Sequence, residues 1–313
     1  MLQQTAGQAR VIDPILSEIA QGYQNQAMVG MALFPVVPVA QRGGKILSFN
    51  KEDFALYTTQ RVPGANTRRV QFGYSSGTYA LEQHSLEAVS PWELQQDAGT
   101  VAKINYAAMA VRKAQNIIAL RTEYAQAALA TTAASYQAAN KTTLAGVNQW
   151  SDYTGTSAPS KDIETAKEAI RTATGQYPNT VVLGAQVMGK LRQHPAIIDR
   201  IKYTGRDVVT PDLLAALWGV ERVLVGGAVY TDAAGTMTDV WGKFVVVAYT
   251  QLGTVADLGE PTYGYTYRLD GAPYVEPGYQ DRNAKSDIYP VTDEVSPVLT
   301  SAIAGYLISA AIA

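Results

Sequence analysis

The sequence predicts a mixed α+β protein with one long helix, a long β-hairpin before it and a compact α/β region after it. Proline is absent from Trp92 through Ala158, and glycine occurs only once between Glu93 and Ala134. Apolar side chains in this stretch recur at the spacing of one helix face. On both sides, short apolar runs alternate with polar residues or are bounded by turn residues, which is typical of strands.

Composition excludes several classes of function. The chain has 313 residues, of which 47% are hydrophobic and 17% charged, with a net charge of −2, two histidines and no cysteine. This charge balance excludes a strongly basic nucleic-acid binder, and the lack of cysteine excludes disulfides and thiolate metal sites. Soluble domains carry about 25% charged residues, so we expect other subunits to cover part of the surface. No metal and no cofactor are expected.

Neither end of the chain carries a targeting or membrane pattern. The first residues, MLQQTAGQAR, lack the basic and apolar regions of a signal peptide, so none is expected. The apolar run from Val298 to Ala313 falls short of the roughly 20 residues that a spanning helix needs. We therefore expect a buried terminal element instead of a membrane anchor, and synthesis in a cytoplasm.

Residues 1–42 are expected to form an extended arm. Two prolines stand in LFPVVPVA, and proline is excluded from helix interiors and central strands. We expect the strip 33–39 to cover apolar surface of its own or an adjacent subunit, through Leu33, Phe34, Pro35 and Val36. Nearer the start, one short amphipathic pattern surrounds Pro14, and its apolar members are Ile12, Ile15, Leu16 and Ile19.

Residues 43–88 are predicted to form a long two-stranded hairpin. The stretch KILSFNKEDF leads out and RRVQFGYSSGTYALEQ returns, with turn residues in RVPGANTRR between them. A hairpin of this length with polar faces is poorly stable alone. A neighbouring subunit is therefore expected to supply a surface for it, and its basic tip is expected to touch that neighbour through Arg61, Arg68 and Arg69.

Residues 89–159 contain the long helix, predicted over Glu93–Ala134. Gln115 and Thr122 lie on its apolar stripe, and polar residues there disfavour a tight coiled coil. The helix is therefore expected to pack across a sheet that includes Tyr263–Leu269.

The remaining chain divides into two regions. Residues 160–250 alternate helical and strand patterns, as in a compact α/β unit. Residues 251–313 return to strands, including TYGYTYRL, whose tyrosines share one strand face.

Two motifs match chemical sites only in part. GAQVMGKL, with Gly184, Gly189 and Lys190, nearly matches a phosphate-binding loop, but Leu191 stands where a hydroxyl would ligate magnesium. An ordinary strand–helix joint is the favoured interpretation. His84 in EQHSLE has no second histidine cluster to form a metal site with, so it is interpreted as a surface residue. No catalytic residue is predicted, and the protein is not expected to be an enzyme.

The order of these parts resembles the major capsid proteins of tailed phages, which share the Hong Kong 97-like fold. That family has an N-terminal arm, a hairpin called the E-loop, a P-domain with a long spine helix, and an α/β A-domain. Local likeness lies in PNTVVLGAQVMGKLRQHPAIIDRIKYT and in DGAPYVEPGYQDRNAKSDIY. The matching ranges here are 1–42, 43–88, 89–159 and 160–250, and residues 251–313 would supply returning P-domain strands and the C-terminus.

The resemblance implies a subunit that assembles, without catalysis, into the icosahedral shell around a phage double-stranded DNA genome. Implied partners are further copies in hexamers and pentamers, a portal, scaffolding or decoration proteins, and packaged DNA in non-specific contact, with no membrane. The protein would belong to the virion and be assembled in the host bacterial cytoplasm. Three alternatives stay open, namely an encapsulin-like cargo shell, a P-loop-like nucleotide-binding enzyme, and a membrane-tethered binding protein whose C-terminal apolar tail would have to insert.

Overall fold

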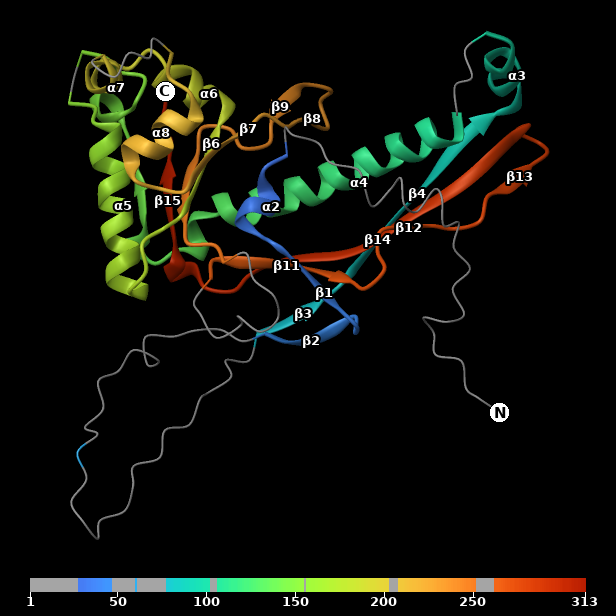
Figure 1. The fold of residues 1–313 in the computed structure, drawn as a ribbon, viewed down its shortest axis with the longest axis horizontal. Helices are drawn as coiled ribbons and strands as arrows, with labels where there is room; N and C mark the ends of the chain where they lie inside the picture. The colour runs from blue at the N-terminus through green and yellow to red at the C-terminus, as the bar shows by residue number, and fades with distance from the viewer. Residues whose placement is uncertain are drawn as a thin grey trace.

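Two β-sheets organise the molecule. A five-stranded sheet with helices around it forms a compact lobe, and a six-stranded sheet with one helix along it extends from the lobe as a long blade (Figure 1). The computed structural model describes residues 28–46, 60, 77–101, 106–154, 156–202, 208–251 and 262–313.

The blade is built on strand β14 (Ser286–Leu299), which has 14 residues. It pairs antiparallel with β4 (Glu82–Pro91) along the whole of that strand and, near its other end, with β11 (Gly264–Leu269). At about 3.4 Å per residue, β14 spans some 45 Å, so this one strand determines the length of the blade. The sheet is completed by β12 (Tyr274–Val275), β13 (Tyr279–Asp281) and β1 (Val36–Val39).

Helix α4 (Tyr106–Thr131) lies along one face of the blade (Figure 1). Val111 and Ile118 are buried in one cluster with Val291 of β14. The prediction of a long helix across the sheet that contains β11 is therefore confirmed for α4.

The predicted start of this helix, at Glu93, is wrong. Residues Trp92–Val101 form a separate helix, α3, which lies beyond the start of α4 and off its axis (Figure 1). The side-chain amide of Gln95 donates to Ser90 Oγ at 2.9 Å and to Asp287 Oδ2 at 3.0 Å. These bonds hold α3 against the end of the blade. Residues 102–105, between the two helices, lie outside the described residues.

The lobe has the strand order β5-β15-β10-β6-β7. These strands are Lys141–Thr143, Gly305–Ser309, Val245–Ala248, Thr180–Gly184 and Arg222–Gly226. The helices of the lobe are α5 (Pro159–Thr174), α6 (Ala185–Leu191), α7 (Pro195–Ile201) and α8 (Pro211–Trp218).

Both faces of the lobe sheet are buried. Val181 and Leu183 of β6 belong to the core that helices α5–α8 complete. Val182, between them, belongs to a second core with Phe34 and Trp241, into which the C-terminal part of α4 also packs. A strand covered on both faces is apolar throughout instead of alternating, which accounts for the uninterrupted run in NTVVLG.

The remaining helices and strands are short. β2 (Gly43–Ile46) and β3 (Gly77–Ala80) pair antiparallel and confirm the base of the predicted hairpin. Its tip lies outside the described residues. The remaining elements are α2 (Gly30–Leu33), β8 (Val229–Thr231), β9 (Met237–Asp239) and the 3-10 turns Ala133–Ser135, Ala138–Asn140, Gly146–Asn148 and Ala302–Ala304.

The last strand, β15, returns to the lobe, whereas the sequence grouped all of 251–313 with the returning strands. Leu307 points into one core of the lobe and Ile308 into the other, and only an inner strand buries both. The expectation of a buried terminal element is confirmed. Among the described helices, none has the length and apolarity that crossing a membrane requires.

We predict that Ile308→Ala lowers the free energy of unfolding by about 2–5 kcal/mol, because it leaves a cavity beside a side chain that is only 1% exposed. The control is Ile198→Ala on α7, at 41% exposure, which should change it by less than about 0.5 kcal/mol. Urea unfolding followed by circular dichroism measures both. Equal losses in the two variants would contradict the inner position of β15.

Candidate assembly surfaces

The arm enters the described structure beside the lobe and joins both parts of the molecule. After α2, strand β1 pairs in parallel with β11, and the backbone N–H of Thr266 donates to Pro35 O at 2.9 Å. Pro38 is exposed, as expected of a proline at the edge of a sheet. The arm thus adds an edge strand to the blade.

The carboxylate of Glu123 anchors the arm to α4. Its Oε1 accepts hydrogen bonds from the backbone N–H of Val29 at 2.9 Å and of Gly30 at 3.0 Å, and from Trp241 Nε1 at 2.7 Å. Glu123 is 2% exposed. Burial raises the pKa of its carboxyl, while the three N–H donors oppose that rise. We call Val29, Gly30, Glu123 and Trp241 the arm anchor.

Glycine is required at position 30. A Cβ atom there would lie 2.2 Å from Gln126 Oε1 and 2.7 Å from Glu123 Oε2. Gln126 is itself fixed, because its Nε2 donates to Thr266 Oγ1 at 2.8 Å. The arm therefore passes close against α4 where any side chain would push it away.

Arg222 makes a second attachment between arm and lobe. Its guanidinium donates to Ala32 O at 3.1 Å, to Thr180 Oγ1 at 2.9 Å and to Thr250 Oγ1 at 3.0 Å. A planar guanidinium presents several donors in a fixed geometry. This side chain can therefore hold α2 and two segments of the lobe at once.

Buried acids fix the base of the predicted hairpin to the blade. Arg42 donates to both oxygens of Glu294, at 2.5 and 2.9 Å, and Glu294 is 1% exposed. Beside Glu294 on β14, Asp293 accepts from Arg268 of β11 at 3.1 Å, a pair within the blade itself. Burial raises the pKa of Asp293, and the charge of Arg268 opposes that rise. The ring of Tyr79 also stacks on that of Tyr267, with centroids 4.5 Å apart.

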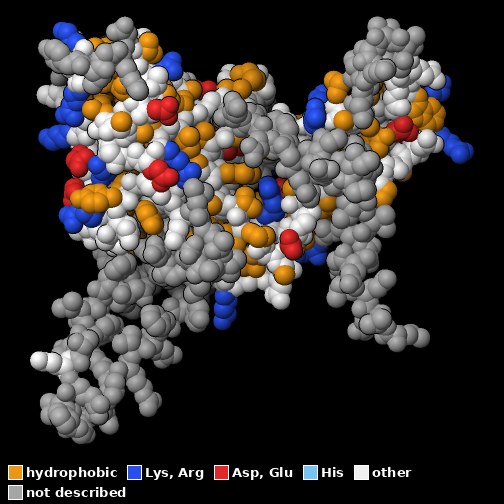
Figure 2. Space-filling view, viewed as in Figure 1, with side chains coloured by type: hydrophobic (Ala, Val, Ile, Leu, Met, Phe, Trp, Pro, Cys, Tyr) orange, Lys and Arg blue, Asp and Glu red, His pale blue; other side chains and the backbone are white. Residues whose placement is uncertain are grey.

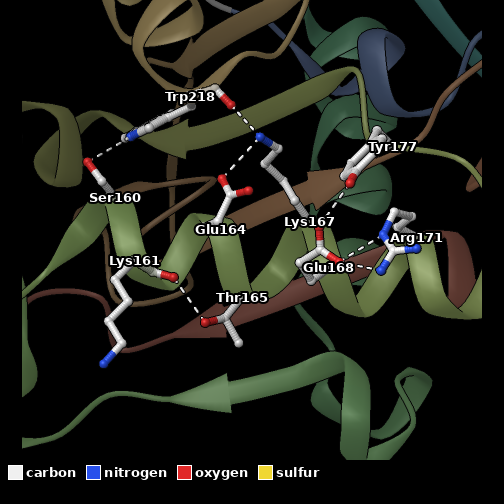
Figure 3. Close-up of polar contacts among 9 residues, drawn as sticks. All are labelled: Ser160, Lys161, Glu164, Thr165, Lys167, Glu168, Arg171, Tyr177 and Trp218. Atoms are coloured by element: carbon white, nitrogen blue, oxygen red, sulfur yellow. Dashed lines mark hydrogen bonds and ion pairs between the residues drawn. The ribbon is translucent and has the colours of Figure 1, made fainter.

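A network of polar side chains orders the outer surface of α5 (Figure 3). Lys167 Nζ donates to Trp218 O at 2.7 Å and so caps a carbonyl at the end of α8. Glu168 accepts from Arg171 Nε at 2.8 Å and from the Tyr177 hydroxyl at 3.0 Å. The bond from Arg171 lowers the pKa of Glu168. Exposed pairs of this kind contribute little to the free energy of unfolding. The effect of this network is therefore to fix the positions of polar side chains on the surface of the lobe.

The two partial chemical motifs form ordinary structure. Strand β6 runs directly into α6 after Gly184, and Lys190 belongs to that helix. The expected strand–helix joint is confirmed, and these residues do not form a loop of free amides. His84 lies on β4 opposite Asp293. Within the described residues, no group of three or more His, Asp or Glu side chains is suited to hold a metal.

The predicted contact residues divide into two sets. Leu33 and Phe34 are fully buried and Pro35 is buried, in each case by residues of the same subunit. Val36 is exposed. Arg61, Arg68 and Arg69 lie outside the described residues. Contact of either set with a neighbouring subunit stays a prediction.

Sequence reasoning missed the arm anchor and the Arg42–Glu294 pair. The sequence offered one weak indication of the arm anchor. Glu123 is the only acid in the 26 residues of α4. Its partners come from two distant parts of the chain, the arm and the segment around Trp241, so no local spacing connects them.

Comparison with known proteins identifies the family. The model of the phage major capsid protein E matches residues 67–286. The major capsid protein of Burkholderia phage BcepMu is 39% identical over 304 residues, which cover 96% of each chain. The crystal structure of a phage-related protein from Bordetella bronchiseptica RB50 is 45% identical, covers 97% of this chain and 98% of its own, and has a TM-score of 0.82. The mature capsid subunit of bacteriophage PhiM1 shares the fold at 16% identity, with a TM-score of 0.54 over 92% of this chain and 88% of its own.

The blade-and-lobe architecture is the mixed helix-and-sheet fold of phage capsid proteins, the Hong Kong 97-like fold. The chain belongs to the phage major capsid protein E family. It therefore assembles with copies of itself into the capsid shell of a phage and is a component of the virion. This family is structural and is not a class of enzymes. The alternatives of a cargo shell and a nucleotide-binding enzyme are not favoured, because the relatives that cover the chain are phage capsid proteins.

The raised pKa of Glu123 predicts a pH-dependent effect of Glu123→Gln. Below the unfolded value of about 4.3, the carboxyl is protonated in both states and resembles the amide. As the pH rises through the raised pKa of the folded state, wild type must ionise a buried group and loses stability. We therefore expect Glu123→Gln to gain stability relative to wild type as the pH increases.

Urea unfolding of both proteins at mildly acidic and neutral pH measures this difference. Glu221→Gln, at an exposed acid of the lobe, is the control and should show no such trend. A difference between wild type and Glu123→Gln that is constant with pH would contradict a raised pKa at the arm anchor.

Proposed function

We propose that the subunit builds an icosahedral shell of hexamers and pentamers around a double-stranded DNA genome, and that the hairpin over 43–88 and the arm make its main contacts with neighbours. The observation that carries this proposal is the separate two-stranded sheet of β2 and β3. A two-stranded ribbon is marginally stable alone. A hairpin that continues beyond this base therefore needs a surface from another subunit.

The parts of the chain take the roles of the Hong Kong 97-like family in this proposal. Residues 1–42 are the arm, 43–88 the E-loop, 89–159 the P-domain with α4 as its spine helix, and 160–250 the A-domain. Two strands cross these bounds, because β4 begins at Glu82 and pairs with the blade strand β14, and β5 pairs with β15 in the lobe sheet. Residues 251–313 return to the P-domain, with β15 added to the A-domain sheet.

The proposed partners follow from the same assignment. Besides further copies, they are a portal, a scaffolding or decoration protein, and the packaged DNA in non-specific contact. Assembly would take place in the host bacterial cytoplasm. The low charged fraction of 17% supports extensive covered surface.

We predict that Arg68→Glu combined with Arg69→Glu leaves a folded subunit that assembles poorly. A single exposed ion pair contributes only about 0–1 kcal/mol, but a shell repeats each contact many times. The defect should be larger at low salt, because charges are then least screened. Sedimentation across a salt series measures shell yield, and circular dichroism checks the fold.

The matched control is Arg200→Glu combined with Lys202→Glu, two exposed basic residues of the lobe. It makes the same change in net charge and should leave the shell yield closer to that of wild type. Equal yields from wild type and the tip variant at every salt concentration would show the tip to be a solvated turn.

Two deletions should separate the roles of the arm. Removing residues 1–39 takes away the buried Leu33 and Phe34, the anchor residues Val29 and Gly30, and strand β1, so the subunit should fail to fold. Removing residues 1–27 keeps these contacts, so it should leave a folded subunit with reduced shell yield. Solubility, circular dichroism and sedimentation distinguish the two results. Normal shells from the shorter deletion would show that those residues are dispensable for assembly.

A further inference from the structure

The outer face of α4 exposes large apolar side chains. Met109, Ile117 and Tyr124 are 53%, 49% and 37% exposed. At 3.6 residues per turn they fall within about a quarter of the helix circumference. On the lobe, exposed hydrophobic side chains lie beside both acidic and basic ones (Figure 2). An apolar stripe on an already packed helix indicates a surface that something else covers.

The same face is basic. Lys113 lies between Met109 and Ile117 on the helix surface, and the Arg121 guanidinium lies 5.9 Å from the centroid of the Tyr124 ring. All 26 residues of α4 are described, and the only acid among them is Glu123, which is buried. The occupant of this face should therefore combine apolar side chains with acidic ones.

The arm contains such a segment. Residues 11–19, VIDPILSEI, hold five apolar side chains together with Asp13 and Glu18, and no lysine or arginine. We propose that residues 11–19 dock on the outer face of α4 in their own subunit, with the apolar side chains over Met109 and Ile117 and the two acids toward Lys113 and Arg121.

The length of chain permits this docking within one subunit. The arm anchor holds Val29 and Gly30 to Glu123, the residue next to Tyr124. The ten residues from Ile19 to Val29 reach at most about 33–36 Å when extended. The helix axis from Glu123 back to Met109 is only about 21 Å long. The arm anchor thus places the arm at one end of the exposed stripe. The residues between the anchor and Ile19 are long enough to reach along the stripe to Met109.

Two other occupants fit less well. Packaged DNA would match the basic side chains but would leave Met109 and Ile117 without an apolar partner. The same segment from a neighbouring copy has the right chemistry, but it lacks the tether that the arm anchor provides. A tether raises the effective concentration of the segment to the millimolar range.

The cysteine-free chain permits a direct test by disulfide formation. Ile15→Cys with Ile117→Cys is introduced into the full chain, and the purified shells are oxidised. A disulfide within one chain, seen as a monomer without free thiols on a non-reducing gel and by mass spectrometry, is the expected result. The control pair is Ile15→Cys with Ile198→Cys, at a comparably exposed isoleucine of the lobe, and it should stay reduced.

The charged contacts are tested in the same background. Lys113→Glu with Arg121→Glu should slow disulfide formation roughly five-fold, as expected of two weak exposed ion pairs. Adding Asp13→Lys with Glu18→Lys should restore the rate, which a general loss of stability would not allow.

Other results would overturn the proposal. Covalent dimers in place of cross-linked monomers would assign the face to the arm of a neighbouring copy. Thiols that stay free, with that of Ile117→Cys shielded from maleimide only in DNA-filled particles, would assign the face to DNA. Thiols that stay free and accessible in all particles would leave the arm undocked.

Discussion

A buried carboxylate, Glu123, joins three parts of the subunit that are far apart in the sequence. It accepts N–H groups from the arm and from Trp241, which lies against the lobe sheet, while its own backbone belongs to the helix of the blade. A buried acceptor without these donors would leave a charge in apolar surroundings at a cost of several kcal/mol. The carboxylate therefore needs the N–H donors of the arm and of Trp241 beside it. These hydrogen bonds fix the positions of the arm, the blade and the lobe relative to one another.

The blade depends on a different constraint, the length of β14. One strand that pairs with β4 along most of its course and with β11 near the lobe produces a long, narrow sheet. Its strands β11 and β12 and the middle of β14 are mostly buried within the subunit, whereas most residues of β4 are exposed.

Contacts at the base of the hairpin differ in kind from those predicted at its tip. At the base, Arg42 binds Glu294, an acid that is nearly inaccessible, and within the blade Arg268 binds the similarly buried Asp293. Breaking one such pair leaves an unpaired buried charge, so the base is fixed firmly. The contacts predicted for the tip are exposed ion pairs, which are individually weak.

The sequence alone determined the mixed α+β class, the helix that became α4, the base of the hairpin and the apolar strand β6. These features follow from local patterns, namely helical spacing, turn residues and uninterrupted apolar runs. Tertiary structure decided the rest. Helix α3 is held to the blade by bonds from Gln95, and β15 lies where its side chains complete two cores of the lobe. The arm anchor depends on residues about 90 and 120 positions apart, and no local pattern can specify a contact whose partners meet only after folding.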